Sequence, residues 1–256
     1  MVGVDRASVG VGKPTFVTAD SFAVGISCML GEQAAHHMRV LRLEIGAIVG
    51  LRDGQGRVGA GRIVRLSKSQ AVIDVEDVRV VDLLPAVHLL VPVADREHML
   101  WLAEKACELA CTSWRPVLWR RSRSVSPRGE GPTFQSKVRA RMEGALAQSE
   151  GAWLPQLFPE ANLERALLAS PPGNRLVLDS HGVPMGAALR ATTQPLVIAL
   201  GPEGGIEDDE LAALEAAGFR RACVAPTILR FETAGVAALA IARSTLTSST
   251  RSEGDE

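Results

Sequence analysis

Hydrophobic and polar residues between Thr15 and Val81 alternate in short segments that turn residues separate. Alternate side chains of a strand point to opposite faces, so each segment predicts a β-strand with one buried face. Turn-forming residues at Asp53–Gly56 and Ser67–Ser69 favour tight reversals. The expected strands are Val17–Leu30, Ala47–Arg52, Arg57–Leu66 and Ala71–Val81. This part of the chain is therefore expected to be a small β-module, with a short helix opened by His36, His37, Arg39 and Arg42.

From Val87 onward, short apolar runs alternate with longer amphipathic segments. The expected strands are Val87–Val93, Pro116–Trp119, Leu176–Leu178, Leu196–Leu200 and Ala222–Ala225. The expected helices are Arg96–Ala110, Phe134–Ser149, Ile206–Ala217 and Thr233–Leu246. Such alternation predicts an α/β domain with a parallel sheet. The boundary is placed at Asp82–Pro85, which predicts two domains, 14–82 and 86–250.

The loop Gly201-Pro202-Glu203-Gly204-Gly205 follows the apolar strand Leu196–Leu200 and precedes a helix. Proline restricts one dihedral angle, whereas glycine permits positive φ and lets another group lie directly on the backbone. Open α/β sheets bind ligands at the carboxyl ends of their strands, so this loop is a candidate binding site. An ordinary strand–turn–helix connection that binds nothing is the alternative.

The kind of ligand can be narrowed by charge. Glu207, Asp208, Asp209 and Glu210 crowd the start of the following helix, where they would repel a phosphate. A neutral or cationic ligand, such as an adenosyl sulfonium, is tolerated. The pattern Gly54-x-Gly56-x-x-Gly59 formally matches a dinucleotide-binding fingerprint, but it lies between two expected strands and no helix follows it. We therefore reject that match.

Composition limits the class of protein. The four cysteines lack CxxC spacing, which indicates reduced packing residues and no metal site. Uncharged runs are too short to span a bilayer, and no secretory signal is visible, so we expect a soluble cytoplasmic protein. The net charge is −1, yet residues 1–141 hold 20 of the 28 Lys and Arg and only 14 of the 29 Asp and Glu. This excess fits phosphate contacts in the first half, although an unevenly charged solvated surface explains it equally well.

Several motifs occur together in one order along the chain. They are HHMRVLR (36–42), DGQG (53–56), EKACELA (104–110), Arg121-Ser122, AQS (147–149), GPEGG (201–205) and ILRFETA (228–234). In this combination the chain resembles the SPOUT methyltransferases, specifically the RsmE-like bacterial family that methylates uridine N3 in small-subunit (16S) ribosomal RNA.

The resemblance implies a fold and a cofactor. It implies a C-terminal α/β trefoil-knot methyltransferase domain, preceded by a small PUA-like β-barrel, and a homodimer. It also implies S-adenosyl-L-methionine as the cofactor, ribosomal RNA or the small subunit as the partner, and no metal. The cofactor-binding residues implied are Leu178, Leu200, Gly201, Glu203, Gly204, Gly205, Val224, Ala225, Ile228, Leu229 and Thr233. The turn Asp179–Gly182 is a candidate lip of the same pocket.

The resemblance also suggests how RNA is bound and methylated. The RNA-binding candidates are Arg39, Arg42, Arg52, Arg57, Arg62, Arg65 and Arg121; four of them alternate with other residues along the expected hairpin, where one face could follow an RNA backbone. Solvated hairpin charges are the alternative. Arg230 is expected to stabilise the uracil anion, and Glu232 to orient it or take the proton, unless the two only form a salt bridge.

The chain departs from the family pattern at several positions. Glu150 and Gly151 follow Gln148-Ser149 where the family has Gly-Arg, and Ala225, Thr227 and Phe231 replace a glycine, an arginine and a threonine. Lost arginines remove RNA contacts. Two alternatives therefore remain: a non-catalytic RNA-binding or ribosome-assembly protein of the same fold, and a methyltransferase with a different RNA target.

Overall fold

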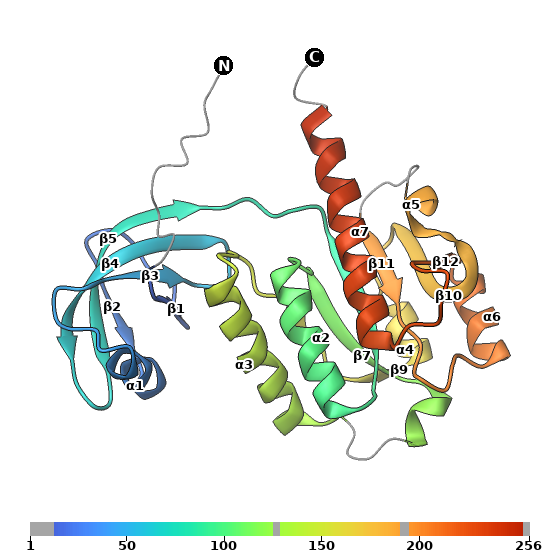
Figure 1. Ribbon diagram of the computed structural model, residues 1–256, viewed down its shortest axis with the longest axis horizontal. Coiled ribbons are helices and arrows are strands. Elements are labelled where there is room, and N and C mark those ends of the chain that lie inside the picture. Colours follow the sequence, from blue (N-terminus) through green and yellow to red (C-terminus); the bar gives the residue numbers. More distant parts are fainter. Residues whose placement is uncertain (1–12, 125–128, 190–194, 253–256) are drawn as a thin grey trace. The chain divides into compact units, whose positions relative to one another are not determined.

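The computed structural model describes residues 13–124, 129–189 and 195–252, which form two compact units (Figure 1). The first unit comprises the described residues up to Leu83 together with Leu146–Trp153. The second comprises Leu84–Ala145 and the described residues from Leu154 onward. The predicted domain ranges differ from these units at residues 146–153, which belong to the first unit although they follow part of the second in sequence.

The first unit is a curled five-stranded sheet with one helix (Figure 1). Its elements are β1 (Thr15–Val17), β2 (Ser27–Leu30), α1 (Glu32–Val40), β3 (Ile48–Arg52), β4 (Arg57–Leu66) and β5 (Ala71–Val80). The order is β1-β3-β4-β5-β2, parallel between β1 and β3 and antiparallel elsewhere. The end strands β1 and β2 do not pair within the described residues, so the predicted barrel is a curled, open sheet. Met38 of α1 packs with Phe16, Leu51, Ile63 and Ile73 in its core.

Trp153 attaches the returning segment to this sheet. Its indole N–H donates to the Val81 carbonyl over 2.9 Å, and its ring covers Gly56. A Cβ at Gly56 would lie 2.4 Å from that ring, and the residue has φ +98°. Both observations explain why the DGQG turn needs glycine at this position.

Two predictions for the first unit are wrong. The segment Val17–Leu30 is not one strand, because the chain turns at Gly25 (φ +79°) before β2 begins. Nor do His36 and its neighbours open the helix: α1 begins earlier, at Glu32, and ends at Val40. Arg42 lies beyond it with φ +56°, a left-handed conformation that terminates the helix.

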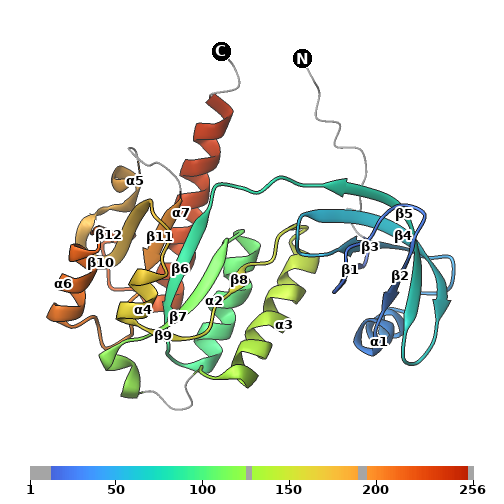
Figure 2. The same cartoon turned by 180° about the vertical axis from the view of Figure 1, so that it is seen from behind.

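The second unit is built on a parallel sheet with strand order β12-β10-β11-β6-β7-β8, and β9 pairs with β7 (Figure 2). Its strands are β6 (Val87–Pro92), β7 (Ser113–Leu118), β8 (Gln156–Leu157), β9 (Ala161–Asn162), β10 (Asn174–Pro184), β11 (Leu196–Ala199) and β12 (Phe219–Cys223). Its helices are α2 (Arg96–Glu108), a short 3₁₀ helix (Arg120–Ser124), α3 (Pro132–Gln148), α4 (Leu163–Leu168), α5 (Met185–Ala188), α6 (Asp208–Ala216) and α7 (Phe231–Ser252). This is the α/β alternation that the hydrophobic pattern predicts.

Helices cover both faces of the parallel sheet. On one face, Ala166 of α4 and Leu214 of α6 pack with Val177 and Val197 of the strands. On the other, α7 lies against α2: a Cβ at Gly235 would be 2.9 Å from Leu102 and 3.0 Å from Leu200. The small residues of α7 therefore bring this helix close to the sheet within the chain itself.

Two strands near the glycine loop differ from their predicted ranges. The predicted turn Asp179–Gly182 lies inside β10, whose pairing with β12 shifts register between Leu178 and Val183. The last strand begins at Phe219, directly after Gly218 (φ +85°) ends the preceding turn. Val224 and Ala225, predicted to be in this strand, thus belong to the loop that leads to α7.

Two cysteines of the second unit, Cys107 and Cys111, are buried packing residues. Burial raises the pKa of the Cys107 and Cys111 thiols to about 12, so they stay protonated at neutral pH. The described residues contain no group of three His, Cys, Asp or Glu that could hold a metal ion. The same part of the chain has no helix that is both long and apolar enough to cross a membrane.

Candidate active site

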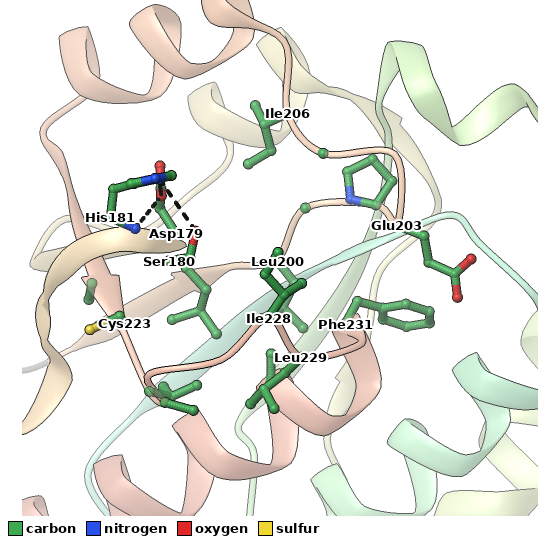
Figure 3. A pocket seen from close by; sticks show the side chains of 18 of the residues that line it. Asp179, Ser180, His181, Leu200, Glu203, Ile206, Cys223, Ile228, Leu229 and Phe231 are labelled. Atoms are coloured by element: carbon green, nitrogen blue, oxygen red, sulfur yellow. Dashed lines mark hydrogen bonds and ion pairs between the residues drawn. The ribbon is translucent and has the colours of Figure 1, made fainter.

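A cavity of about 400 Å³ lies at the carboxyl ends of β10, β11 and β12 (Figure 3). Asp179, Ser180 and His181 from β10 lie on one side of it, and Glu203 and Phe231 lie on the other. Ile228 and Leu229, from the loop before α7, lie between them. The GPEGG and ILRFETA motifs, far apart in sequence, thus form one site because their strands are close together in the parallel sheet.

Most of the predicted cofactor-binding residues line this cavity: Leu178, Leu200, Gly201, Glu203, Gly205, Val224, Ala225, Ile228 and Leu229. Gly204 and Thr233 do not. The lining also includes residues that were not predicted as cofactor-binding: Pro202, Ile206, Leu211, Ala222, Cys223, Thr227, Phe231 and Ala234. Several of these flank a predicted residue in sequence, which was the signal available for finding them.

The glycines of the loop have different surroundings. A Cβ at Gly201 would lie 2.7 Å from Cγ1 of Ile206, whereas a Cβ at Gly204 would lie 3.1 Å from Cβ of Arg121. Gly205 has φ +79°, and its N–H donates to the Pro202 carbonyl over 2.8 Å, which closes a tight turn. Gly204 therefore faces Arg121, whereas Gly201 and Gly205 line the cavity.

The acidic residues after the loop are paired within the fold. The Arg120 guanidinium bonds to Glu207 at 3.0 Å and to Asp209, and its backbone N–H donates to Glu210 over 2.9 Å. These hydrogen bonds raise the pKa of Arg120. The acids that would repel a phosphate are thus partly neutralised by a loop distant in sequence.

Arg121 also bonds to this region. Its Nη1 donates to the Gly204 carbonyl over 2.7 Å, and its Nε lies 3.6 Å from Glu207. The side chain thereby supports the glycine loop. Its role in binding RNA stays a prediction.

The two predicted catalytic residues differ in exposure. Arg230 is exposed, and its guanidinium forms no ion pair with any described residue. Glu232 is 7% exposed, and its Oε2 has no hydrogen-bond partner within the described chain. The salt bridge between them that the sequence left open is not formed in this structure.

His98 is a site residue that the sequence reasoning missed. Its Nδ1 lies 3.7 Å from Oε1 of Glu232 and 3.6 Å from Oε1 of Glu203. The signal available in the sequence was the position of His98. Asp95 comes shortly after β6 and caps α2, so the side chains in the first turn of α2 lie at the same edge of the sheet as the GPEGG loop.

The predicted RNA-binding arginines of the first unit do not form one free stripe. Arg52 is 6% exposed, and burial lowers its pKa. Arg62 pairs with Glu76 at 2.8 Å, and Arg57 lies 3.9 Å from Asp53. The exposed candidates are Arg39, Arg42, Arg62 and Arg65. Their contact with RNA stays a prediction, and Arg52 would need to leave its buried position to take part.

Known protein families match both parts of the chain. Residues 82–243 match an RNA methyltransferase domain, and residues 30–76 match an RNA methyltransferase PUA domain. A curated relative, the ribosomal RNA small subunit methyltransferase E of Synechocystis sp., is 29% identical over 215 residues. That match covers 81% of this chain and 69% of the relative.

Solved structures share the fold. Ribosomal RNA small subunit methyltransferase E from Neisseria gonorrhoeae, bound to S-adenosyl methionine, is 24% identical with a TM-score of 0.82, over 91% of this chain and 97% of that one. A Legionella pneumophila protein solved with the cofactor SAM is 21% identical with a TM-score of 0.82, over 91% and 98%. The predicted fold class, a PUA-like module before an α/β methyltransferase domain, is confirmed.

Proposed function

Because this chain belongs to the RNA methyltransferase family, we propose that it transfers a methyl group from S-adenosylmethionine to N3 of a uridine in small-subunit (16S) ribosomal RNA. The observation that supports this most is the cavity of about 400 Å³ where the GPEGG and ILRFETA segments meet. The name of the Synechocystis relative supports the choice of substrate. Small ribosomal subunits are cytoplasmic, so the protein would act there.

The lining of the cavity fits an adenosyl sulfonium. Leu178, Leu200 and Leu229 offer apolar contacts, and the described residues that line the cavity include no lysine or arginine that would favour a phosphate. The Asp179 and Glu203 carboxylates suit ribose hydroxyls and a positive charge. The predicted cofactor set, with Gly204 and Thr233 as neighbours of the lining, is thus our proposal for the binding site. When bound, S-adenosylmethionine supplies an electrophilic methyl group.

Uridine N3 carries a proton, so it must lose that proton as it accepts the methyl group. Arg230 is exposed next to the cavity residue Leu229, where its guanidinium could stabilise negative charge on the uracil carbonyl oxygens. Glu232 has a buried carboxylate oxygen without a hydrogen-bond partner among the described residues, which suits a proton acceptor. We assign the first role to Arg230 and the second to Glu232.

We also propose that the protein acts as a homodimer and that its first unit binds RNA. Gly235, Ala238 and Ala242 of α7 are already buried within the chain. The dimer contact would therefore use the more accessible side of this helix, at Ala237, Ala240 and Ile241. The exposed arginines of the first unit would contact phosphates.

Nucleoside mass spectrometry of 16S ribosomal RNA, from cells with and without this protein, tests the proposed function. We expect 3-methyluridine to be lost without the protein and restored by purified protein with S-adenosylmethionine. Calorimetry separates the alternatives. A protein that binds RNA but not the cofactor would be a non-catalytic relative, whereas cofactor binding with methylation elsewhere would indicate a different RNA target.

A further inference from the structure

His98, Glu203 and Glu232 converge from three separate elements of the second unit. His98 lies in the first turn of α2, Glu203 in the loop after β11, and Glu232 in the first turn of α7. The imidazole Nδ1 is 3.6 Å from one carboxylate and 3.7 Å from the other. Glu203 also lines the cofactor cavity, where it lies on the same side as Phe231 (Figure 3). The cluster therefore connects the cavity to the buried carboxylate of Glu232.

The cluster contains polar atoms without partners. Within the described chain, neither Nδ1 of His98 nor Oε2 of Glu232 has a hydrogen-bond partner, and both are buried. Buried polar groups are nearly always hydrogen-bonded, so an unpaired one indicates a partner supplied by a ligand, a water or a small movement. Both His98 distances are slightly beyond hydrogen-bonding range, and catalytic contacts often tighten only in the complex with substrate. Among the described residues, the Oε2 atom of Glu232 thus lacks the partner that a buried carboxylate oxygen normally has.

His98 provides the ion-pair contact of this cluster. Within the described chain, neither Glu203 nor Glu232 forms an ion pair with a lysine or arginine. The nearby Arg121 bonds to the Gly204 carbonyl and lies close to Glu207. Two carboxylates that face each other without a donor between them repel each other. The Asp95 side chain, which accepts the backbone N–H of His98 over 3.1 Å, holds the turn that carries the imidazole. Phe231 packs beside its ring, with 6.3 Å between ring centroids.

We propose that His98 is a positioning residue for methyl transfer, and this inference rests on the proposed function. Its Nδ1–H bridges Glu203 and Glu232 and keeps the Glu232 carboxylate aimed at the uracil. In the reaction, the N3–methyl bond forms as the sulfur–methyl bond breaks, and the sulfonium becomes a neutral thioether. The N3 proton passes to Glu232. His98 itself touches neither the methyl group nor N3.

The test compares three variants of the full chain acting on unmethylated small ribosomal subunits. His98→Ala removes the Nδ1–H donor. In His98→Asn, the amide nitrogen can replace that donor. Glu97→Ala, at the exposed neighbouring residue, is the control. For His98→Ala we expect kcat to fall at least about tenfold. Its cofactor Kd should stay within about threefold of the wild-type value, because His98 does not line the cavity. His98→Asn should recover most of the kcat, and the control should match the wild type.

Rescue by asparagine separates this role from a purely structural one. The asparagine amide restores a donor between the two carboxylates, so kcat should recover in His98→Asn, whereas a residue that only fills space would be replaced equally well by leucine. An unchanged kcat in His98→Ala overturns the proposal, as does an equal loss of kcat and cofactor affinity. If His98→Ala does not fold, His98→Leu replaces it, and equal kcat values for the Leu and Asn variants overturn the proposal. An inactive wild-type protein contradicts the proposed function, and with it the role of His98. If the wild type and His98→Ala are equally active, only the role of His98 is contradicted.

Discussion

Neighbouring glycines in the loop after β11 contact different groups, so replacing them should have different effects. At Gly201, valine would press on Ile206, 2.7 Å from the added Cβ, and push that side chain into the cavity that both residues line. At Gly204, the added Cβ would meet Arg121 at 3.1 Å, away from the cavity lining. We therefore expect a substitution at Gly201 to affect cofactor binding more than one at Gly204, although the sequence alone gave no reason to separate the two.

We predict that Gly201→Val weakens S-adenosylmethionine binding at least about tenfold, which corresponds to about 1.4 kcal/mol. Gly204→Val is the matched control. The valine at this position would contact Arg121 and not the cavity lining, so the cofactor Kd should change less. Calorimetry on both variants, with thermal unfolding to confirm the fold, measures the difference. Equal losses of affinity in the two variants would place the cofactor elsewhere.

Arg230 is predicted to act on the uracil and not on the RNA backbone. Arg230→Ala should abolish methyl transfer but leave RNA affinity and its salt dependence nearly unchanged. The matched variant Arg65→Ala, at an exposed position of the first unit, should instead weaken RNA binding and flatten the salt slope by about 0.7 to 0.9. Filter binding over a salt series, with transfer of labelled methyl groups, measures both. Full activity of Arg230→Ala would remove it from the catalytic site.

At the scale of elements, α7 stabilises the end of α2 through a buried arginine. Arg243 is 9% exposed, and its guanidinium donates to the carbonyls of Leu109, Pro85 and Ala110. The last carbonyls of a helix lack partners within the helix, so a donor from another element satisfies them. Burial lowers the pKa of Arg243, which shows that its charge is partly desolvated.

We expect Arg243→Met to lower the free energy of unfolding by about 2 to 4 kcal/mol, because methionine keeps the packing volume but leaves buried carbonyls without donors. Arg139→Met on α3 is a matched control, since Arg139 is exposed and pairs with Glu143 at 3.0 Å. That variant should change stability by less than about 1 kcal/mol. Urea unfolding curves measure both, and similar values would show that Arg243 does not cap α2.

At the scale of the whole molecule, the oligomeric state can be tested directly. The buried stripe of α7 already packs against α2 and the sheet, as the contacts of Gly235 with Leu102 and Leu200 show. Its close packing is therefore explained within one chain. A dimer contact through α7 would therefore use the remaining surface of this helix.

We predict a homodimer with a mass twice the 27.2 kDa of one chain. Ala240 is exposed on α7, so Ala240→Arg should produce monomers without unfolding the chain, because a charged side chain disrupts a close helix contact. Light scattering at micromolar concentration, with circular dichroism as the check on folding, measures this. A wild-type protein that scatters as a single chain would contradict the dimer, and a dimeric Ala240→Arg would move the contact to another surface.

The sequence by itself determined the class of the longer elements and the order of the two modules, but it did not predict β8, β9, α4 or α5. Apolar periodicity predicted β4 at its observed bounds and placed α2 and α6 within two residues of their observed ends, whereas α7 continues to Ser252, beyond its predicted end at Leu246. The resemblance to the SPOUT methyltransferases implied eleven cofactor-binding residues, and nine of them line the cavity. The prediction of the longer elements worked because local propensity and turn chemistry depend on neighbours in sequence.

Only the tertiary structure decided which side chains contact each other across the fold. It placed Arg120 and Arg121 against the acidic helix start and the glycine loop, and His98 between Glu203 and Glu232. It also buried Arg52, whose position on an alternating strand looked exposed. These contacts join residues separated by many positions, and they arise because a parallel sheet collects the ends of its strands at one edge. No local pattern of hydrophobic and polar residues contains that information.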